Sequence, residues 1–441
     1  MVADHTEHRH VRKTACVLGG YGLIGAACAR ALSQSGFVII GVGRSETSAR
    51  QVQADIGWRI LDLAEASVEQ LRHAVAGADV VVNAAGALQD GLQDNVIAIH
   101  ETMVARLVAA LEGTTTRVVQ ISAAGVSPNS STEFFRSKAR GDALLMASRL
   151  DWVVLRPSLV LAREAYGGTA LLRASAAVPL VRLQVLGQSR IETVSIDDVT
   201  AAVVSAARGE IAGGTVADLT EPGSHSLDDV VRSVRSWLGL PPWRTAIRVP
   251  DAMVGLLAKL ADALGYLGWR SPLRSTAIRV LSEGIHGDPR PWQDAGGDCR
   301  PLAETLAAMP ATPQDRWYAR LYLMLPAIVG TLALFWLSSG VIGFIQFDEA
   351  ARILTERGVA RPTAAFLVLG GACLDMLLGA GILFRRSARS AALAMAGMSL
   401  LYLLGGTLLA ADLWGDPLGP LLKVLPVLAL ALVAAAIVGE R

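Results

Sequence analysis

The sequence predicts an α/β protein with an open parallel sheet and a small C-terminal lobe, followed by an all-α bundle of four transmembrane helices. Short apolar runs alternate with amphipathic stretches in the first part of the chain, which is typical of a parallel sheet covered by helices on both faces. A glycine-rich turn follows the first apolar run. Beyond about residue 311, long stretches without charge predict helices that cross a membrane.

Three glycines organise the first part of the chain, because they stand between a short apolar run and a helical stretch. They are Gly19, Gly22 and Gly25. We expect Gly19 to permit a tight turn, Gly22 to let backbone approach phosphate groups, and Gly25 to let helix and strand pack closely. Such a turn presents helix N-terminal amides, here near Leu23 and Ile24, to a pyrophosphate. The pattern predicts a dinucleotide site; a purely structural glycine turn is the alternative.

The second apolar run, residues 36–44, ends in Arg44 about twenty residues beyond the glycines. A carboxylate at this place would hold the ribose hydroxyls of NAD, whereas a guanidinium suits the 2′-phosphate of NADP. The sequence therefore favours NADP(H) over NAD(H). A solvated arginine in a turn is the alternative.

The next two strands, residues 58–63 and 79–86, place further candidates at the same edge of the sheet. Asp62 could accept a hydrogen bond from the adenine amino group, or it could cap the following helix; Leu63 follows it. The small residues at the end of the fourth strand leave room for a cofactor, and they are Asn83, Ala84, Ala85 and Gly86.

The rest of the first part continues the alternation. Residues 95–111 predict an amphipathic helix, residues 117–122 a strand that ends in Ser122, and residues 152–156 a sixth strand. Residues 250–267 predict another amphipathic helix. Residues 285–316 carry five prolines and predict an irregular linker with one short helix.

Composition excludes several classes of protein. The net charge of +1 gives no basic field for nucleic acid. The four cysteines show neither metal-ligand nor disulfide spacing, so we expect no metal site and a reducing compartment. Residues 1–13 predict a disordered tail, with no apolar segment typical of a signal peptide.

Four apolar stretches predict the transmembrane helices, and they are residues 321–347, 363–384, 390–411 and 418–438. Asp375 lies in the second stretch and is a candidate for proton movement or for contact with a quinone headgroup; hydrogen bonding to a neighbouring helix is the alternative. The loop with Arg385, Arg386 and Arg389 predicts that both termini are cytoplasmic.

Together these residues resemble a known family. Residues 14–310 resemble an extended or atypical short-chain dehydrogenase/reductase with a Rossmann-like sheet, and the nearest likeness is the NAD(P)H-binding accessory subunit of respiratory complex I and its bacterial relatives. The matching pieces are GGYGLIG at 19–25, Asp62–Leu63, residues 83–86, Ser122, Lys138, residues 156–158 and residues 196–199. Residues 311–441 are similar to the DoxX-like family of four-helix membrane proteins, some of which work with quinone-linked oxidoreductases.

One departure from the reductase pattern bears on activity. Active members carry Tyr-x-x-x-Lys, in which the tyrosine passes a proton to or from the substrate. Here Lys138 is in place, but Phe134 stands four residues before it and has no proton to give. The resemblance implies that Ser122 would orient a substrate carbonyl and that Lys138 would hold the nicotinamide ribose.

The resemblance implies a protein of a bacterial-type inner membrane that binds NADP(H) and leaves its enzymatic activity open. We expect an atypical reductase-like oxidoreductase linked to a membrane redox pool, with a quinone or a respiratory-type membrane complex as partner. The alternatives are a non-catalytic assembly or sensing factor that binds NADP(H), and an NAD-dependent epimerase/dehydratase-like enzyme.

Overall fold

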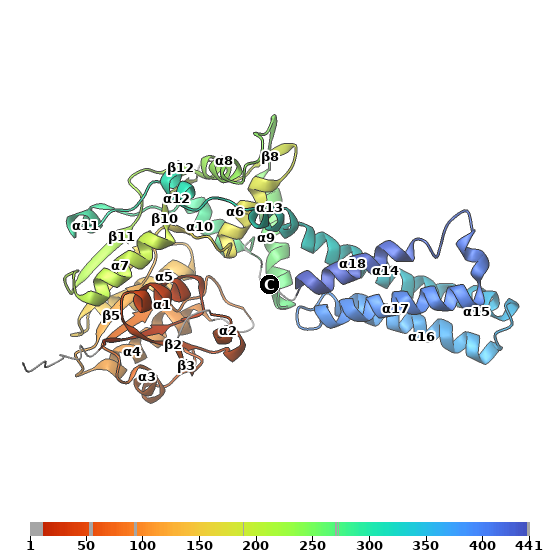
Figure 1. Ribbon diagram of the computed structural model, residues 1–441, viewed down its shortest axis with the longest axis horizontal. Helices are drawn as coiled ribbons and strands as arrows, with labels where there is room; N and C mark the ends of the chain where they lie inside the picture. The colour runs from red at the N-terminus through yellow and green to blue at the C-terminus, as the bar shows by residue number, and fades with distance from the viewer. Residues whose placement is uncertain are drawn as a thin grey trace, which may run out of the picture. The chain divides into compact units, whose positions relative to one another are not determined.

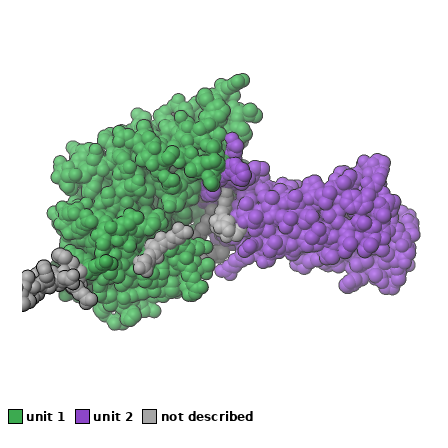
Figure 2. All heavy atoms as spheres, viewed as in Figure 1, with its two compact units in different colours: residues 1–262, 272–316 green, residues 263–271, 317–441 purple. Residues whose placement is uncertain are grey.

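The computed structural model describes residues 12–52, 56–91, 95–187, 189–269, 271 and 273–438. The chain forms two compact units: unit 1 comprises residues 1–262 and 272–316, and unit 2 comprises residues 263–271 and 317–441 (Figure 2). Residues 1–11 of the expected disordered tail lie outside the described residues.

Unit 1 is built on a seven-stranded parallel sheet (Figure 1), which confirms the predicted α/β class. Its strands are β1 (Thr14–Leu18), β2 (Val38–Gly43), β3 (Gly57–Ile60), β4 (Val80–Asn83), β5 (Arg117–Ile121), β6 (Trp152–Pro157) and β11 (Thr215–Leu219). Their order is β11-β6-β5-β4-β1-β2-β3. The order reverses between β1 and β4, and ligands bind at the carboxyl ends of the strands at such a point.

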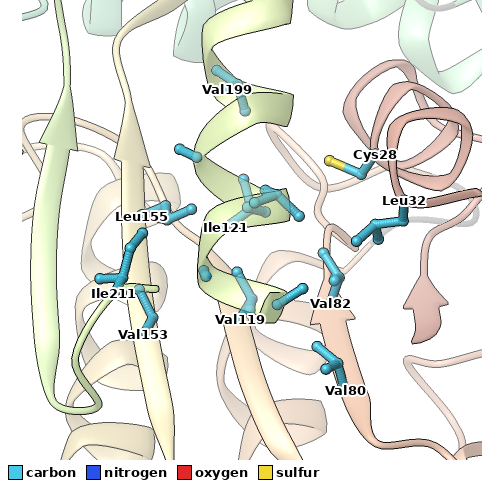
Figure 3. Close-up of a cluster of buried hydrophobic side chains, with 14 of the residues drawn as sticks. Cys28, Leu32, Val80, Val82, Val119, Ile121, Val153, Leu155, Val199 and Ile211 are labelled. Atoms are coloured by element: carbon cyan, nitrogen blue, oxygen red, sulfur yellow. The ribbon is translucent and has the colours of Figure 1, made fainter. Parts of the chain in front are cut away.

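Helices cover both faces of this sheet because successive strand residues point to opposite sides. On one face, α1 (Leu23–Gln34) and α7 (Ile196–Arg208) pack together; Figure 3 shows Leu32 of α1 near Val82 of β4, and α7 with Val199 in front of β5 and β6. On the other face lie α3 (Val68–Val75), α4 (Met103–Leu111) and α5 (Glu133–Met146). Both faces of β1 are fully buried, which explains its unbroken apolar run.

The predicted helix over residues 95–111 has a wider first part. A π-helical turn, η1 (Ala98–Thr102), precedes α4 and contains the buried His100. Such turns often mark positions under a special packing constraint. Here the carbonyl of His100 lies so close to Gly141 of α5 that a side chain at Gly141 would collide with it.

Further elements complete unit 1, and the longest of them continues from Ala263 into unit 2. They are α2 (Glu46–Arg50), β7 (Leu159–Leu161), α6 (Gly167–Ala177), β8 (Val181–Gln184), β9 (Arg190–Ile191), β10 (Thr193–Ser195), β12 (His225–Ser226), α8 (Leu227–Trp237), β13 (Thr245–Arg248), α9 (Asp251–Tyr266) and α10 (Ser275–Glu283). Three two-stranded sheets pair β10 with β7, β12 with β9 and β13 with β8.

The expectation of a linker over residues 285–316 is wrong. The segment contains α11 (Arg290–Asp294), α12 (Leu302–Ala308) and the start of α13 (Pro313–Tyr322). Trp292 and Cys299 are buried in the core beneath α7, and the guanidinium of Arg300 lies 2.7 Å from the carboxylate of Asp198. Burial and this ion pair hold a proline-rich segment against unit 1 despite its irregular backbone.

Unit 2 is helical. Among the described residues, three helices are long and apolar enough to cross a membrane: α14 (Met324–Ile345), α16 (Arg361–Gly381) and α17 (Ala388–Leu409). Unit 2 also contains α15 (Phe347–Glu356), η2 (Ala411–Trp414), α18 (Val424–Val438) and the end of α13 from Trp317. Buried side chains of α14, α17 and α18 form a common core.

The fourth predicted span, residues 418–438, is helical only from Val424. Gly419 has a positive φ of 55°, which a helix through this residue does not allow, and turns follow at residues 420–423. The fifteen residues of α18 rise only about 22 Å, less than the hydrocarbon core of roughly 30 Å. The helical start at residue 418 was therefore wrong, and a fourth membrane crossing stays a prediction.

Candidate functional site

The glycine turn ends β1 and starts α1 at the point where the strand order reverses. Gly19 has a positive φ of 73°, and its N–H donates to the carbonyl of Val42 over 2.9 Å. Gly22 is the N-cap residue of α1, and no side chain caps this helix. The first-turn amides of α1 therefore lack a side-chain acceptor, which is the arrangement that binds an anion at a helix N-terminus.

The three glycines differ in the space around them. A Cβ at Gly25 would collide with the carbonyl oxygen of Gly19, and a Cβ at Gly19 would lie 2.9 Å from the backbone of Ala85. A Cβ at Gly22 would meet only the carbonyl of Gly19, at 3.3 Å. Gly19 and Gly25 are thus required by the fold itself, whereas Gly22 leaves its surroundings open for a ligand.

Arg44 directly follows β2 and is half-buried. Its N–H donates to the hydroxyl of Tyr21 over 3.2 Å, and the Tyr21 ring lies 6.2 Å from that of Trp58. Tyr21 therefore connects the glycine turn to the end of β2. The motif itself could have identified it, because an aromatic residue inside a glycine turn must lie over a neighbouring strand.

Asp62 and Leu63 follow β3. The Asp62 carboxylate accepts a hydrogen bond from the N–H of Ala64 over 3.1 Å, and Leu63 is buried. One carboxylate oxygen of Asp62 thus closes a local turn, whereas Ser67 caps the following helix α3, so the expectation that Asp62 caps this helix is wrong.

The end of β4 is held by its own side chain. The Asn83 amide donates to the side-chain oxygen of Gln120 on β5 over 2.8 Å, and its oxygen accepts from the N–H of Ala85 over 3.2 Å. The Ala84 N–H donates to the carbonyl of Leu18, and Gly86 is exposed. Asn83 therefore shapes the loop through internal bonds, and Ala84 to Gly86 supply its small surface.

Ser122, Asp142 and Arg156 form a buried network at the ends of β5 and β6. The Ser122 hydroxyl donates to the Asp142 carboxylate over 2.7 Å, and the Arg156 guanidinium donates to the same oxygen over 3.2 Å. The Lys138 ammonium donates to the carbonyl of Ile121 over 3.2 Å. Burial raises the pKa of Asp142 and lowers the pKa of Lys138.

Phe134 occupies the position where the related reductases have tyrosine. Its ring centroid lies 5.8 Å from the Lys138 ammonium and 5.6 Å from the His100 ring. The structure therefore brings Ser122, Phe134 and Lys138 to one rim together with His100. The phenyl ring of Phe134 offers no proton to a substrate oxygen.

His100 is neutral. Its Nε2 accepts a hydrogen bond from the N–H of Ala87 over 3.1 Å, so the ring proton is on Nδ1, which lies 2.9 Å from the hydroxyl of Ser137. Burial and the nearby Lys138 lower the pKa of His100 to about 2. Both ring nitrogens are thus used to join η1, α5 and the loop after β4.

Sequence reasoning missed His100 and Asp142, although signals were present. His100 falls on the apolar face of the predicted 95–111 helix, four residues after Val96. Asp142 lies four residues after Lys138, so a helix places both on one face.

A second polar cluster lies within the apolar helices of unit 2. The Asp375 carboxylate on α16 accepts hydrogen bonds from Ser339 on α14 over 2.6 Å and from Tyr402 on α17 over 2.7 Å. Trp336 stacks on Tyr402 at 6.3 Å, and its buried indole N–H has no hydrogen-bond partner among the described residues. The structure thus shows the hydrogen bonds to neighbouring helices that were the alternative for Asp375. The indole N–H of Trp336 is a further donor in this cluster.

Among the described residues, no group of three or more His, Cys, Asp or Glu side chains could hold a metal ion.

Comparison with known families identifies both parts of the chain. Residues 19–210 match the family model described as NAD(P)H-binding, and residues 333–432 match the DoxX-like family. The chain therefore combines an NAD(P)H-binding domain with a DoxX-like domain, as the resemblance indicated. No curated protein matches the sequence.

Solved structures with a similar fold include the enzyme WbmG, a putative epimerase and a UDP-glucose 4-epimerase. WbmG of Bordetella bronchiseptica, in complex with NAD and UDP, is 17% identical with a TM-score of 0.51 over 69% of this chain and 94% of its own. A putative epimerase from Burkholderia cenocepacia is 21% identical with a TM-score of 0.51 over 68% and 99% of the two chains. UDP-glucose 4-epimerase of Thermotoga maritima is 13% identical with a TM-score of 0.51 over 70% and 99%. At these identities the likeness establishes the fold.

Proposed function

We propose that residues 14–310 bind NADP(H) and that residues 311–441 form a domain that anchors them in a membrane. The uncapped N-terminus of α1 beside the open Gly22 is the observation that carries the nucleotide proposal. The cofactor would fit this turn because only the carbonyl of Gly19 lies near the Cβ position of Gly22, while the amides of α1 need an acceptor.

Each candidate residue has a place in this proposal. Gly19, Gly22, Leu23, Ile24 and Gly25 would hold the pyrophosphate. Arg44 would bind the 2′-phosphate, since it follows β2 at the spacing that selects between the two nucleotides. The remaining candidates would contact the adenine, the ribose and the nicotinamide path, and they are Asp62, Leu63, Asn83, Ala84, Ala85, Gly86 and Lys138.

The chemistry we propose is oxidation of NADPH by a membrane-soluble quinone. The bound nicotinamide supplies a hydride. The chain's rim is poorly suited to protonate an alcohol or ketone, because Phe134 has no proton and the Ser122 proton is directed at Asp142. A quinone that accepts the hydride needs one proton to become the quinol, and water can supply it, so this acceptor class needs no tyrosine. The Asp375 cluster, with its unused Trp336 N–H, is our candidate contact for the quinone oxygens.

The test is NADPH oxidation by a short-chain quinone, followed through nicotinamide absorbance with the full chain in lipid nanodiscs. We expect turnover that falls at least about tenfold in Asp375→Asn, with NADPH affinity unchanged, because the carboxylate is replaced without loss of volume. Arg44→Asp should weaken NADPH binding by about tenfold or more and improve NADH binding, because it exchanges the phosphate-binding cation for a ribose-binding carboxylate. Binding without turnover would contradict the redox proposal.

A non-catalytic assembly or sensing factor is the second candidate. It is favoured by Phe134, which has no proton to donate, together with the hydrogen bonds that commit Ser122 and His100 to partners within the protein. This function predicts tight NADPH binding, no quinone reduction and a membrane protein that co-purifies in a nucleotide-dependent manner. An epimerase/dehydratase-like activity ranks third, because its likeness to the sugar-nucleotide enzymes is one of fold and the tyrosine is absent.

The basic turn with Arg385, Arg386 and Arg389 supports an inner membrane location with both termini in the cytoplasm. Membrane-impermeant labelling of a cysteine introduced at Arg386 in intact cells and in inverted vesicles tests this orientation. We expect labelling only in inverted vesicles; labelling in intact cells would reverse the topology.

A further inference from the structure

Helix α9 carries an apolar face that the protein does not cover. Met253, Leu256, Leu257, Leu260 and Leu264 are between 42% and 58% exposed. At about 100° per residue they occupy an arc of roughly 100° on one side of the helix. Five large apolar side chains in one continuous stripe form a surface that water solvates poorly.

The other sides of α9 have different characters. Val254, Ala258 and Ala261 are buried and form the face that packs against the protein. Lys259 is exposed and lies to one side of the apolar stripe. Asp262 lies opposite the stripe and accepts a hydrogen bond from Arg274 over 3.3 Å. The helix is therefore divided into a packed face, a polar face and an uncovered apolar face.

The end of α9 is fixed beside the membrane helices. Just after the helix, the carbonyl of Leu267 accepts a hydrogen bond from the N–H of Arg385, in the turn between α16 and α17, over 3.0 Å. The indole N–H of Trp269 donates to the carbonyl of Leu383 over 2.6 Å, and the Arg385 guanidinium lies 5.9 Å from the Trp269 ring. These contacts lie within unit 2 and place the C-terminus of α9 at the ends of two apolar helices.

This end of unit 2 has the composition of a membrane–water interface. Arg385, Arg386 and Arg389 follow α16 closely, while Tyr266 and Trp317 are largely exposed. Tryptophan, tyrosine and arginine concentrate where apolar helices emerge from lipid, and basic residues there attract anionic headgroups.

We propose that α9 lies in the membrane interface with its stripe of Met253, Leu256, Leu257, Leu260 and Leu264 inserted into an anionic lipid leaflet. The lipid is the occupant because the helix is continuous with a segment bonded to the ends of the apolar helices. An interfacial helix of this kind buries its apolar face about 5–10 Å deep at the boundary between headgroups and acyl chains. The membrane would then hold the nucleotide-binding unit through α9 as well as through the apolar helices of unit 2.

The test compares two labelled positions on opposite sides of α9 in the full chain. Leu257→Cys lies in the stripe, whereas Gly255→Cys is the matched control, because a side chain at Gly255 meets nothing within 4 Å and points away from the stripe. Both are made after Cys373→Ala, which removes the exposed member of the four native cysteines. Each variant receives an environment-sensitive fluorophore and is placed in nanodiscs of phosphatidylglycerol and brominated phosphatidylcholine.

We expect brominated lipid to quench the label at position 257 by roughly twofold or more and to leave the label at position 255 nearly unchanged. Quenching at neither position would overturn the proposal. A blue-shifted emission at position 257 without quenching would also overturn it, because a protein surface, such as a second copy of this chain, would then cover the stripe.

Discussion

The glycine turn and the rim around Phe134 belong to the same edge of one sheet, but they satisfy their polar groups in opposite ways. At the turn, the N-terminal amides of α1 have no capping side chain, and Gly22 leaves open space. At the rim, Ser122 is bonded to Asp142 and both nitrogens of His100 have partners. The comparison teaches that the turn is suited to a ligand, while the rim stabilises the fold.

The largest effect we expect is on stability, from Asp142→Ala at the rim. The substitution leaves the guanidinium of Arg156 without its buried carboxylate, which costs about 3 kcal/mol. Urea unfolding of the full chain in detergent measures the loss, and NADPH affinity should stay within about twofold when measured under folded conditions. Asp142→Asn is the control, since it keeps the volume and an acceptor; equal stability of Asp142→Ala and the wild type would refute a stabilising rim.

The reverse outcome is expected for Gly22→Ala at the turn. A methyl group there meets only one carbonyl oxygen, so folding should tolerate it, while phosphate groups can no longer approach the backbone. We expect NADPH affinity to fall by at least about tenfold, or roughly 1.4 kcal/mol. Gly168→Ala, where a Cβ meets nothing within 4 Å, is the matched control. Equal affinities of these two variants would remove the distinction between turn and rim.

His100 adds a pH dependence to the rim. Its pKa is about 2 in the folded protein, far below the usual value of about 6.5. The unfolded chain therefore binds a proton that the folded chain does not, so stability is full above about pH 6.5 and falls as the pH decreases. Between pH 7.5 and 5.5 the wild type should lose about 1.4 kcal/mol more than His100→Gln. Identical pH profiles would show that His100 is not held neutral.

The smallest effect is expected from Phe134→Tyr. The half-buried ring gains a hydroxyl near the Lys138 ammonium without loss of packing. NADPH affinity should change by less than about twofold, and the ammonium should hold the pKa of the new phenol below its usual value of about 10. Ultraviolet difference titration against the wild type detects this group. A phenol that titrates at its ordinary value would place the ring outside the influence of Lys138.

Local patterns were enough to predict the sheet, the glycine turn and the apolar helices. The alternation of buried strands and amphipathic helices depends on periods that the sequence displays directly. Local patterns do not predict the ion pair of Arg300 or the burial of Trp292. Arg300 pairs with Asp198, about a hundred positions away, and Trp292 is buried among residues distant in the sequence. The helix break at Gly419 depends on one backbone angle, and a hydropathy pattern does not report it.

The candidate site shows the same limit. The positions of Gly22, Ser122, Phe134 and Lys138 follow from motif order. Their bonds do not: which partner the Ser122 hydroxyl takes depends on how α5 packs against β5 and β6. Sequence could therefore predict which residues gather at the rim but not which of them would bond to one another.

The most direct test of the account is an equilibrium titration of the solubilised full chain with NADPH and with NADH, followed through nicotinamide fluorescence. The account predicts saturable binding of NADPH, at least about tenfold tighter than that of NADH, and an NADPH affinity at least about tenfold weaker in Gly22→Ala. Failure of the folded wild type to bind either nucleotide would contradict it.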